Sequence, residues 1–140
     1  MTVIPKRIAI VCGDFHADIA ATMISAAEDE ATSAGVNAIQ IVKIPGSYEA
    51  PLVTDRLLAT ATEAVIVLGY IEKGETLHGE IMGRVVHQAL IDLQIKHQKP
   101  IGFGIIGPGA TRQQAEARHI DYARAAVRAA LRSYQTLQSL

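Results

Sequence analysis

The sequence is poor in cysteine and aromatic residues. Cys12 is the single cysteine among 140 residues, and tryptophan is absent. One cysteine forms no internal disulfide and has no second thiolate to build a structural zinc site. Cys12 ends an apolar segment, so we expect it to be a small buried residue at the end of a strand.

The chain also lacks a charge excess and a long apolar run. Its formal net charge is -1 and it has no long basic segment, which argues against nucleic acid or an anionic membrane as partner. The apolar stretches fall short of the roughly 20 residues that a membrane span needs, and no signal-peptide segment opens the sequence. We therefore expect a cytoplasmic protein.

Several motifs of known chemistry are missing as well. The sequence contains neither a Walker A pattern, nor GxGxxG after its first strand, nor a GxSxG elbow. Its acidic residues and histidines show no metal-ligand spacing. These absences argue against nucleotide binding by the common phosphate loops, against a serine hydrolase of the GxSxG type and against a metal centre.

Strand-like and helix-like segments alternate along the chain, and 49% of its residues are apolar. This composition predicts a single domain spanning residues 1–140 with one core. Periodicity predicts strands over 7–13, 38–46, 63–69 and 100–107, and helices over 17–34, 50–61, 81–98 and from a cap at Thr111 onward. The alternation predicts an α/β fold with a four-stranded parallel sheet and right-handed crossovers.

A polar, glycine-bearing loop follows each predicted strand. In parallel α/β sheets the ligand crevice lies outside the carboxyl ends of the strands, so we expect these four loops to meet at one edge. The loops are Gly13–His16, Pro45–Glu49, Gly69–Glu80 and Gly107–Arg112.

The third loop reads GYIEKGETLHGE and has two interpretations. Gly74 and Thr76 either cradle an anion with backbone N–H groups and a hydroxyl, or form an ordinary helix cap. His78 is either a proton-transfer group or an ordinary polar residue. Glu80 either orients that imidazole or is an acid favoured by the helix dipole.

Three further residues are also open to two interpretations. Phe15 is either a stacking platform for a planar ring or a core plug that anchors its loop. Glu49 either accepts hydrogen bonds from a polyol or is an acid at a helix start. Arg118 either binds a phosphate bidentately or lies on a solvated helix face.

Taken together, the motifs resemble 6,7-dimethyl-8-ribityllumazine synthase over essentially the whole chain. The matching segments are, in order, Asp14-Phe-His16, Ile44-Pro-Gly-Ser-Tyr-Glu-Ala-Pro-Leu52, Leu68-Gly-Tyr-Ile-Glu-Lys-Gly-Glu-Thr-Leu-His78, Gly102-Phe-Gly104 and Gln114-Ala-Glu-Ala-Arg118. The segment GPGATRQQA and the following Asp121-Tyr122 look most like the archaeal form of the enzyme.

This resemblance implies a flavodoxin-like α/β/α sandwich and the penultimate step of riboflavin synthesis. The enzyme condenses 5-amino-6-(D-ribitylamino)uracil with 3,4-dihydroxy-2-butanone 4-phosphate and releases phosphate and two waters. No cofactor is implied. The family's site lies between neighbouring subunits of a homopentamer, and twelve pentamers form an icosahedral shell in some members.

The resemblance also implies a role for each matching residue. His78 would move protons during imine formation and phosphate elimination. Phe15 would stack on the pyrimidine and Phe103 would line the ring pocket near the next subunit. The remaining substrate contacts would be Ser47, Tyr48 and Glu49 to the ribityl chain, Tyr70, Ile71 and Glu72 to the uracil edge, and Glu75, Thr76 and Arg118 to the butanone phosphate.

The chain departs from the family pattern at three places. His16 stands where the family usually has asparagine, and Gly79 stands where an aromatic often follows the histidine. The usual lysine near the start of the last helix is missing, with Arg124 as a possible substitute. Two other functions of the same fold stay open: a non-catalytic flavin or lumazine carrier, and an archaeal-type riboflavin synthase, which we expect to lack the GxTxH arrangement.

Overall fold

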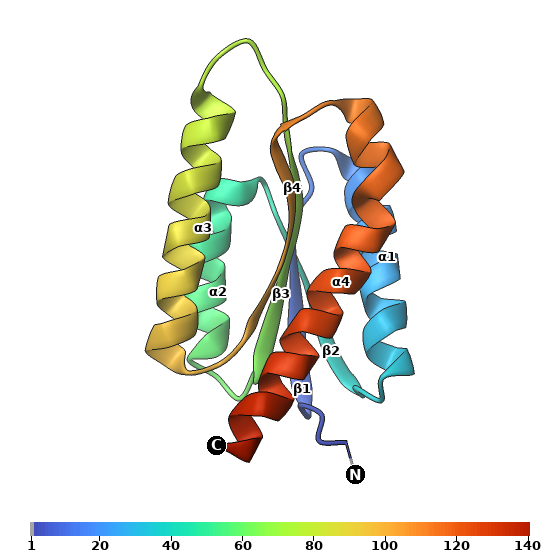
Figure 1. Cartoon of the computed structure of the whole chain (residues 1–140), viewed down its shortest axis with the longest axis vertical. Coiled ribbons are helices and arrows are strands. Elements are labelled where there is room, and N and C mark those ends of the chain that lie inside the picture. The colour runs from blue at the N-terminus through green and yellow to red at the C-terminus, as the bar shows by residue number, and fades with distance from the viewer. Residues whose placement is uncertain (1) are drawn as a thin grey trace.

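The computed structural model describes residues 2–140 as alternating strands and helices. In chain order these are β1 (Arg7–Gly13), α1 (Ala17–Ser33), β2 (Ala38–Ile44), a 3₁₀ helix η1 (Ser47–Glu49), α2 (Ala50–Leu58), β3 (Ala64–Glu72), α3 (His78–His97), β4 (Ile101–Ala110) and α4 (Arg112–Ser139). Over this range the four strands form one parallel sheet of order β2-β1-β3-β4. Helices α1 and α4 cover one face and α2 and α3 the other (Figure 1), which confirms the predicted flavodoxin-like sandwich.

Alternation along β1 divides the core between the two faces of the sheet. Ile8 and Ile10 pack with residues of α1 and α4, whereas Ala9 and Val11 pack with residues of α2 and α3. Successive side chains of a strand point to opposite faces, so a strand with helices on both sides must be apolar throughout. This explains why β1 and β3 read as nearly unbroken apolar runs.

Cys12 is fully buried at the end of β1, as predicted. Burial raises the pKa of its thiol to about 12, with a smaller contribution from the nearby Asp14 carboxylate. A thiol with such a pKa stays protonated at neutral pH and is a poor nucleophile. Its role is to fill space between the sheet and the α1 side of the core.

Helix α4 is fixed at both ends. Thr111 caps it in a capping box with Gln114, as the sequence indicated at Thr111. Near the other end, the Tyr134 hydroxyl donates a hydrogen bond to Glu63 Oε2 (2.5 Å), and this bond raises the tyrosine pKa to about 12. The second carboxylate oxygen of Glu63 accepts from the Lys6 backbone N–H (2.8 Å), so the residue just before β3 contacts segments near both chain ends.

Two strands are longer than the sequence suggested. Strand β3 continues to Glu72 instead of ending at Gly69, and β4 continues to Ala110 instead of Gly107. The two strands extend together across a register shift between Tyr70 and Glu72. The polar residues past Gly69 that we expected in a loop therefore begin on a strand.

Two helices also have different bounds. Helix α3 begins at His78 instead of Ile81, and α2 ends at Leu58 instead of Ala61. The earlier start of α3 places the histidine in its first turn. Within the part of the chain that the structure describes, no helix combines the length and the apolar character needed to cross a membrane.

Close contact between β4 and α4 depends on glycine. A Cβ built on Gly102 would overlap the carbonyl oxygen of Ala126 and lie 3.0 Å from Ile66 Cδ1. A Cβ on Gly104 would lie 2.5 Å from Leu68 Cδ2 and 3.1 Å from Ala126 Cβ. The two glycines thus let the backbone of α4 rest directly on the edge strand.

We expect Gly102→Ala to lower the free energy of unfolding by about 1–3 kcal/mol, because the added methyl must push α4 away from the sheet. Urea denaturation followed by circular dichroism measures this change. Gly74→Ala is the matched control, since a Cβ there meets nothing within 4 Å. Equal stability of the two variants would show that α4 does not pack against β4 as closely as described.

Candidate active site

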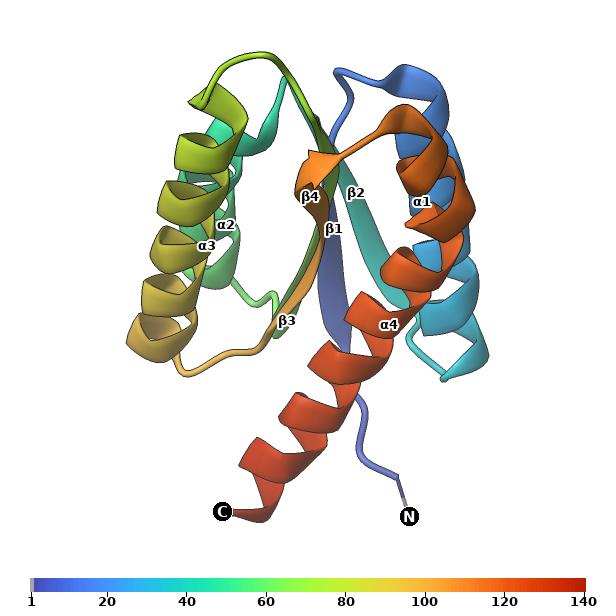
Figure 2. The ribbon, with the colours of Figure 1, turned by 45° about the horizontal axis from the view of Figure 1, so that its top comes forward.

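A cavity of about 340 Å³ opens at the carboxyl ends of the strands. Its walls come from the segments that follow β1 and β2 and from the end of β3 with its following loop. The lining residues are Phe15, His16, Gly46, Ser47, Tyr48, Glu49, Tyr70, Ile71, Glu72, Gly74, Thr76, His78, Gly79 and Met82. Figure 2 shows the β1–α1 and β3–α3 connections at this same end of the sheet.

The sheet order explains the position of the cavity. The chain passes from β1 to the outer strand β2 and then returns to β3 on the other side of β1. Connections on the two sides therefore diverge at β1, and ligands of open α/β sheets bind at such a switch point. The cavity contains most of the residues selected from the sequence; Glu75, Phe103 and Arg118 lie outside it.

The first two walls are joined by backbone contacts. The Asp14 N–H donates to the Ile44 carbonyl (2.9 Å), and a Cβ on Gly13 would lie 3.4 Å from the Gly46 Cα. The small residues bring the loops after β1 and β2 together. Ser47 is buried beneath them at 8% exposure, and Glu49 follows in the same turn.

Phe15 projects into solvent at the rim, with 82% of its surface exposed. This exposure rules out the core-plug interpretation, because a plug would be covered by the residues it anchors. Tyr48 also lines the cavity and is also exposed, at 55%. Two exposed rings that line one cavity suit a planar ligand that covers apolar surface.

The third wall is the extension of β3. Tyr70 and Ile71 are both buried and belong to opposite faces of the sheet. The Tyr70 hydroxyl donates to the Ala110 carbonyl (3.0 Å) and lies 3.4 Å from Glu72 Oε2. Burial, followed by the charge of Glu72, raises the pKa of Tyr70, so its phenol remains a neutral donor.

The loop after β3 leads to a helix start without a strong cap. Leu77 is the N-cap residue of α3 and makes no side-chain cap bond. Thr76 Oγ1 accepts from the His78 N–H at 3.4 Å, a long and weak hydrogen bond. The cap interpretation of Thr76 therefore holds only in this weak form, and first-turn N–H groups remain available to an anion.

Glu80 does not act on the imidazole of His78. Its Oε1 accepts from Arg84 Nη2 at 2.6 Å, one helical turn further on. The first-turn acid interpretation therefore holds for Glu80. Met82, one turn after His78, lines the cavity but did not stand out in the sequence, because an apolar residue at helical spacing reads as ordinary core.

Phe103 and Arg118 lie elsewhere on the molecule. Phe103 is half-buried on edge strand β4 and lines a separate cavity of about 460 Å³ with Asp121 and Tyr122 of α4. Arg118 is exposed on α4. Arg124 lines another cavity with Thr22 and other residues of α1.

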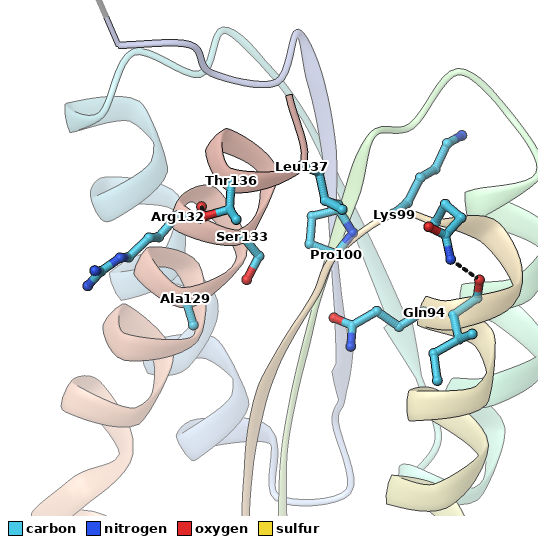
Figure 3. A pocket seen from close by; sticks show the side chains of 10 residues that line it. Gln94, Lys99, Pro100, Ala129, Arg132, Ser133, Thr136 and Leu137 are labelled. Carbon is cyan, nitrogen blue, oxygen red and sulfur yellow. Dashed lines mark hydrogen bonds between the residues drawn. The ribbon is translucent and has the colours of Figure 1, made fainter. Parts of the chain in front are cut away.

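A larger cavity of about 580 Å³ lies at the opposite end of the sheet, between the last turns of α3 and α4 (Figure 3). Two of its polar side chains already have protein partners: Gln94 Oε1 accepts from the Ile101 N–H (2.8 Å), and Lys99 Nζ donates to the carbonyls of Leu58 (2.8 Å) and Thr60 (2.9 Å). Arg132 points away from the other side chains (Figure 3). These hydrogen bonds hold the ends of helices and strands in place. We therefore place the candidate site in the cavity at the carboxyl ends of the strands.

The sequence also matches known proteins over most of its length. The sequence profile described as 6,7-dimethyl-8-ribityllumazine synthase matches residues 5–138. The chain is 41% identical over 128 residues to the 6,7-dimethyl-8-ribityllumazine synthase of Aeropyrum pernix, covering 90% of this chain and 87% of the relative. It is 41% identical over 135 residues to that of Staphylothermus marinus, covering 96% and 90%, and 37% identical over 127 residues to that of Pyrobaculum arsenaticum, covering 90% and 85%.

The exposure of Phe15 predicts how its loss affects folding. We expect Phe15→Ala to change the free energy of unfolding by less than about 0.5 kcal/mol, as for an ordinary surface substitution. A buried plug would instead cost about 3–5 kcal/mol. Urea denaturation distinguishes the two, and a loss in the larger range would restore the core-plug interpretation.

Proposed function

The chain belongs to the 6,7-dimethyl-8-ribityllumazine synthase family, and on this basis we propose that it condenses 5-amino-6-(D-ribitylamino)uracil with 3,4-dihydroxy-2-butanone 4-phosphate. The products are 6,7-dimethyl-8-ribityllumazine, inorganic phosphate and two waters, in the cytoplasmic synthesis of riboflavin. The observation that carries the proposal is the meeting of Phe15, Glu49 and His78, which follow three different strands, in one cavity.

The chemistry requires little from the protein. The pyrimidine brings the amines and the second substrate brings the ketone and the leaving phosphate. Holding two such reactants in the right geometry supplies much of the rate enhancement by itself. The protein adds an anion site and a histidine side chain that can transfer protons.

The pyrimidine occupies the cavity between the first two walls and the end of β3. Phe15 stacks on its ring, and the nearby Ser47, Tyr48 and Glu49 hold the hydroxyls of the ribityl chain. The uracil edge meets the segment Tyr70–Glu72, largely through backbone groups. Support comes from the burial of Ser47 and the exposure of the Phe15 ring, which both line the cavity.

The butanone phosphate lies at the start of α3. Backbone amides near Glu75 and the hydroxyl of Thr76 hold the phosphate, aided by the helix dipole. The weak cap of α3 supports this assignment, since Thr76 and the first-turn amides are not fully engaged within the chain. Arg118 of a neighbouring subunit supplies the counter-charge.

His78 is the proton-transfer group. It lies exposed in the first turn of α3 and lines the cavity. From this position it gives a proton to the hydroxyl that leaves as water during imine formation. It then takes a proton from carbon as the C–O bond to phosphate breaks.

The site is completed by a second copy of the chain in a homo-oligomer, either a pentamer or a sixty-subunit shell of pentamers. Two observations support this proposal. Phe103 and Arg118 lie outside the cavity that holds the other candidates. One side of α3 also exposes a row of apolar side chains that a partner would cover: Leu77 (67%), Ile81 (51%), Val85 (55%) and Ile95 (63%).

The proposed activity is tested by mixing the purified protein with both substrates and following lumazine absorbance together with phosphate release. We expect turnover above the spontaneous background. The absence of turnover, with lumazine or flavin still bound, would instead favour a carrier. Conversion of added lumazine into riboflavin would favour a riboflavin synthase.

We expect His78→Ala to lower kcat moderately, by about 10²-fold, because general acid–base catalysis is lost while the positioning of the reactants remains. Steady-state kinetics measures kcat and both KM values. Complete inactivation with intact substrate binding would contradict this division of roles. Exposed His78 carries no fold-stabilising bond from its ring, so the variant should fold normally.

Mixed oligomers test whether two chains share a site. A Phe15→Ala/His78→Ala chain and an Arg118→Ala chain are each expected to be impaired alone. Unfolded together and refolded as a mixture, they should regain roughly a quarter of the wild-type sites, because an active site needs one intact half from each neighbour. No gain over the separate variants would contradict a shared site.

A further inference from the structure

Both phenylalanines of the chain lie against a histidine ring. The centroids of Phe15 and His16 are 5.1 Å apart with an interplanar angle of 77°, an edge-to-face contact. Phe103 and His87 are 6.1 Å apart at 21°. Of these two pairs, Phe15 and His16 line the active-site cavity.

His16 also touches a third ring. Its centroid lies 4.6 Å from that of Tyr70, with the planes tilted by 38°. We call Phe15, His16 and Tyr70 the ring ladder. It runs from the exposed rim of the cavity to the buried end of β3, with the imidazole in the middle.

The two ends of the ring ladder differ in freedom. Tyr70 is 8% exposed and its hydroxyl is bonded to the Ala110 carbonyl at 3.0 Å, so this ring is fixed. Phe15 is 82% exposed, and such a side chain exchanges among rotamers unless a neighbour restricts it. The edge contact with His16 is what connects the mobile end to the fixed one.

The side chain of His16 has no role in starting its helix. His16 is the N-cap residue of α1, yet it makes no side-chain cap hydrogen bond. Serine, threonine, asparagine and aspartate are preferred there because their oxygen atoms satisfy a free N–H. The imidazole instead lies half-buried between two rings on the cavity side.

We propose that His16 is a positioning residue that holds the Phe15 ring in the orientation needed to stack on the pyrimidine substrate. This inference rests on the proposed function. The role assigned to His16 requires its flat ring and does not involve proton transfer. An aromatic contact made before binding lowers the ordering cost at the moment of binding.

The test compares His16→Phe, which keeps a flat ring, with His16→Ser, which removes the ring and supplies a cap oxygen. We expect His16→Ser to raise the KM for the pyrimidine by about three- to tenfold, the range that corresponds to one aromatic pair. Its kcat and its KM for the butanone phosphate should stay within about twofold. His16→Phe should keep all three parameters near wild type across the pH profile.

Thermal unfolding separates this role from a structural one. His16→Ser should unfold at the wild-type temperature or above it, because the serine caps α1. Weaker pyrimidine binding in an equally stable variant supports positioning. A pyrimidine KM that is unchanged in His16→Ser would overturn the proposal, as would a His16→Phe variant as impaired as His16→Ser, since the ring nitrogens would then be the groups that matter.

A binding measurement keeps this inference apart from the proposed function. Titration of each variant with 5-amino-6-(D-ribitylamino)uracil alone, by calorimetry, reports affinity without turnover. If wild type does not turn over but its pyrimidine affinity still depends on the ring at position 16, the proposed condensation is wrong and the positioning role of His16 stands. Equal pyrimidine affinity of wild type and His16→Ser would overturn the positioning role of His16 even if turnover is normal.

Discussion

The parallel alignment of β1, β2 and β3 is the constraint on which the site depends. Gly13 pairs with Ile44, and Cys12 pairs with Leu68, so the three strands reach the same edge of the sheet in register. Each connection must then leave the sheet beside the others, and the return of the chain past β1 opens a gap between them. A slip of one residue in this register would turn the side chains of a strand to the opposite face and break both halves of the core.

Much of this arrangement follows from the sequence. Apolar runs such as AVIVLG are typical of strands covered on both faces, and the helices between them require crossovers and hence a parallel sheet. The grouping of Phe15, Glu49 and His78 in one cavity follows from the same rule. The extension of β3 through Tyr70 to Glu72 did not follow, because it depends on pairing with β4, a partner distant in sequence. The exposure of the Phe15 side chain did not follow either, because it depends on which residues distant in sequence pack against the ring.

We propose that the site draws residues from two chains, and local sequence rules do not reveal such sharing. Arg118 in QAEAR reads as a solvated helical arginine, and its exposed position on α4 fits that interpretation as well as it fits a phosphate contact with a neighbour. What favours the second is the exposed apolar row on α3 together with Phe103 on the edge strand. An exposed apolar row is unfavourable in an isolated domain and becomes favourable when a partner covers it.

The helix starts show how stability and function are divided at this edge. Helices α1, α2 and α3 begin at His16, Glu49 and Leu77 without a side-chain cap, although each cap is typically worth about 1 kcal/mol. Helix α4 begins outside the cavity and has a full capping box. An oxygen placed over the first turn of α3 would occupy the N–H groups proposed to hold the phosphate, and an N-cap side chain at His16 would be drawn away from the rings. The weak starts around the cavity therefore fit its proposed use as a binding site, while α4 and the Glu63 contacts supply stability elsewhere.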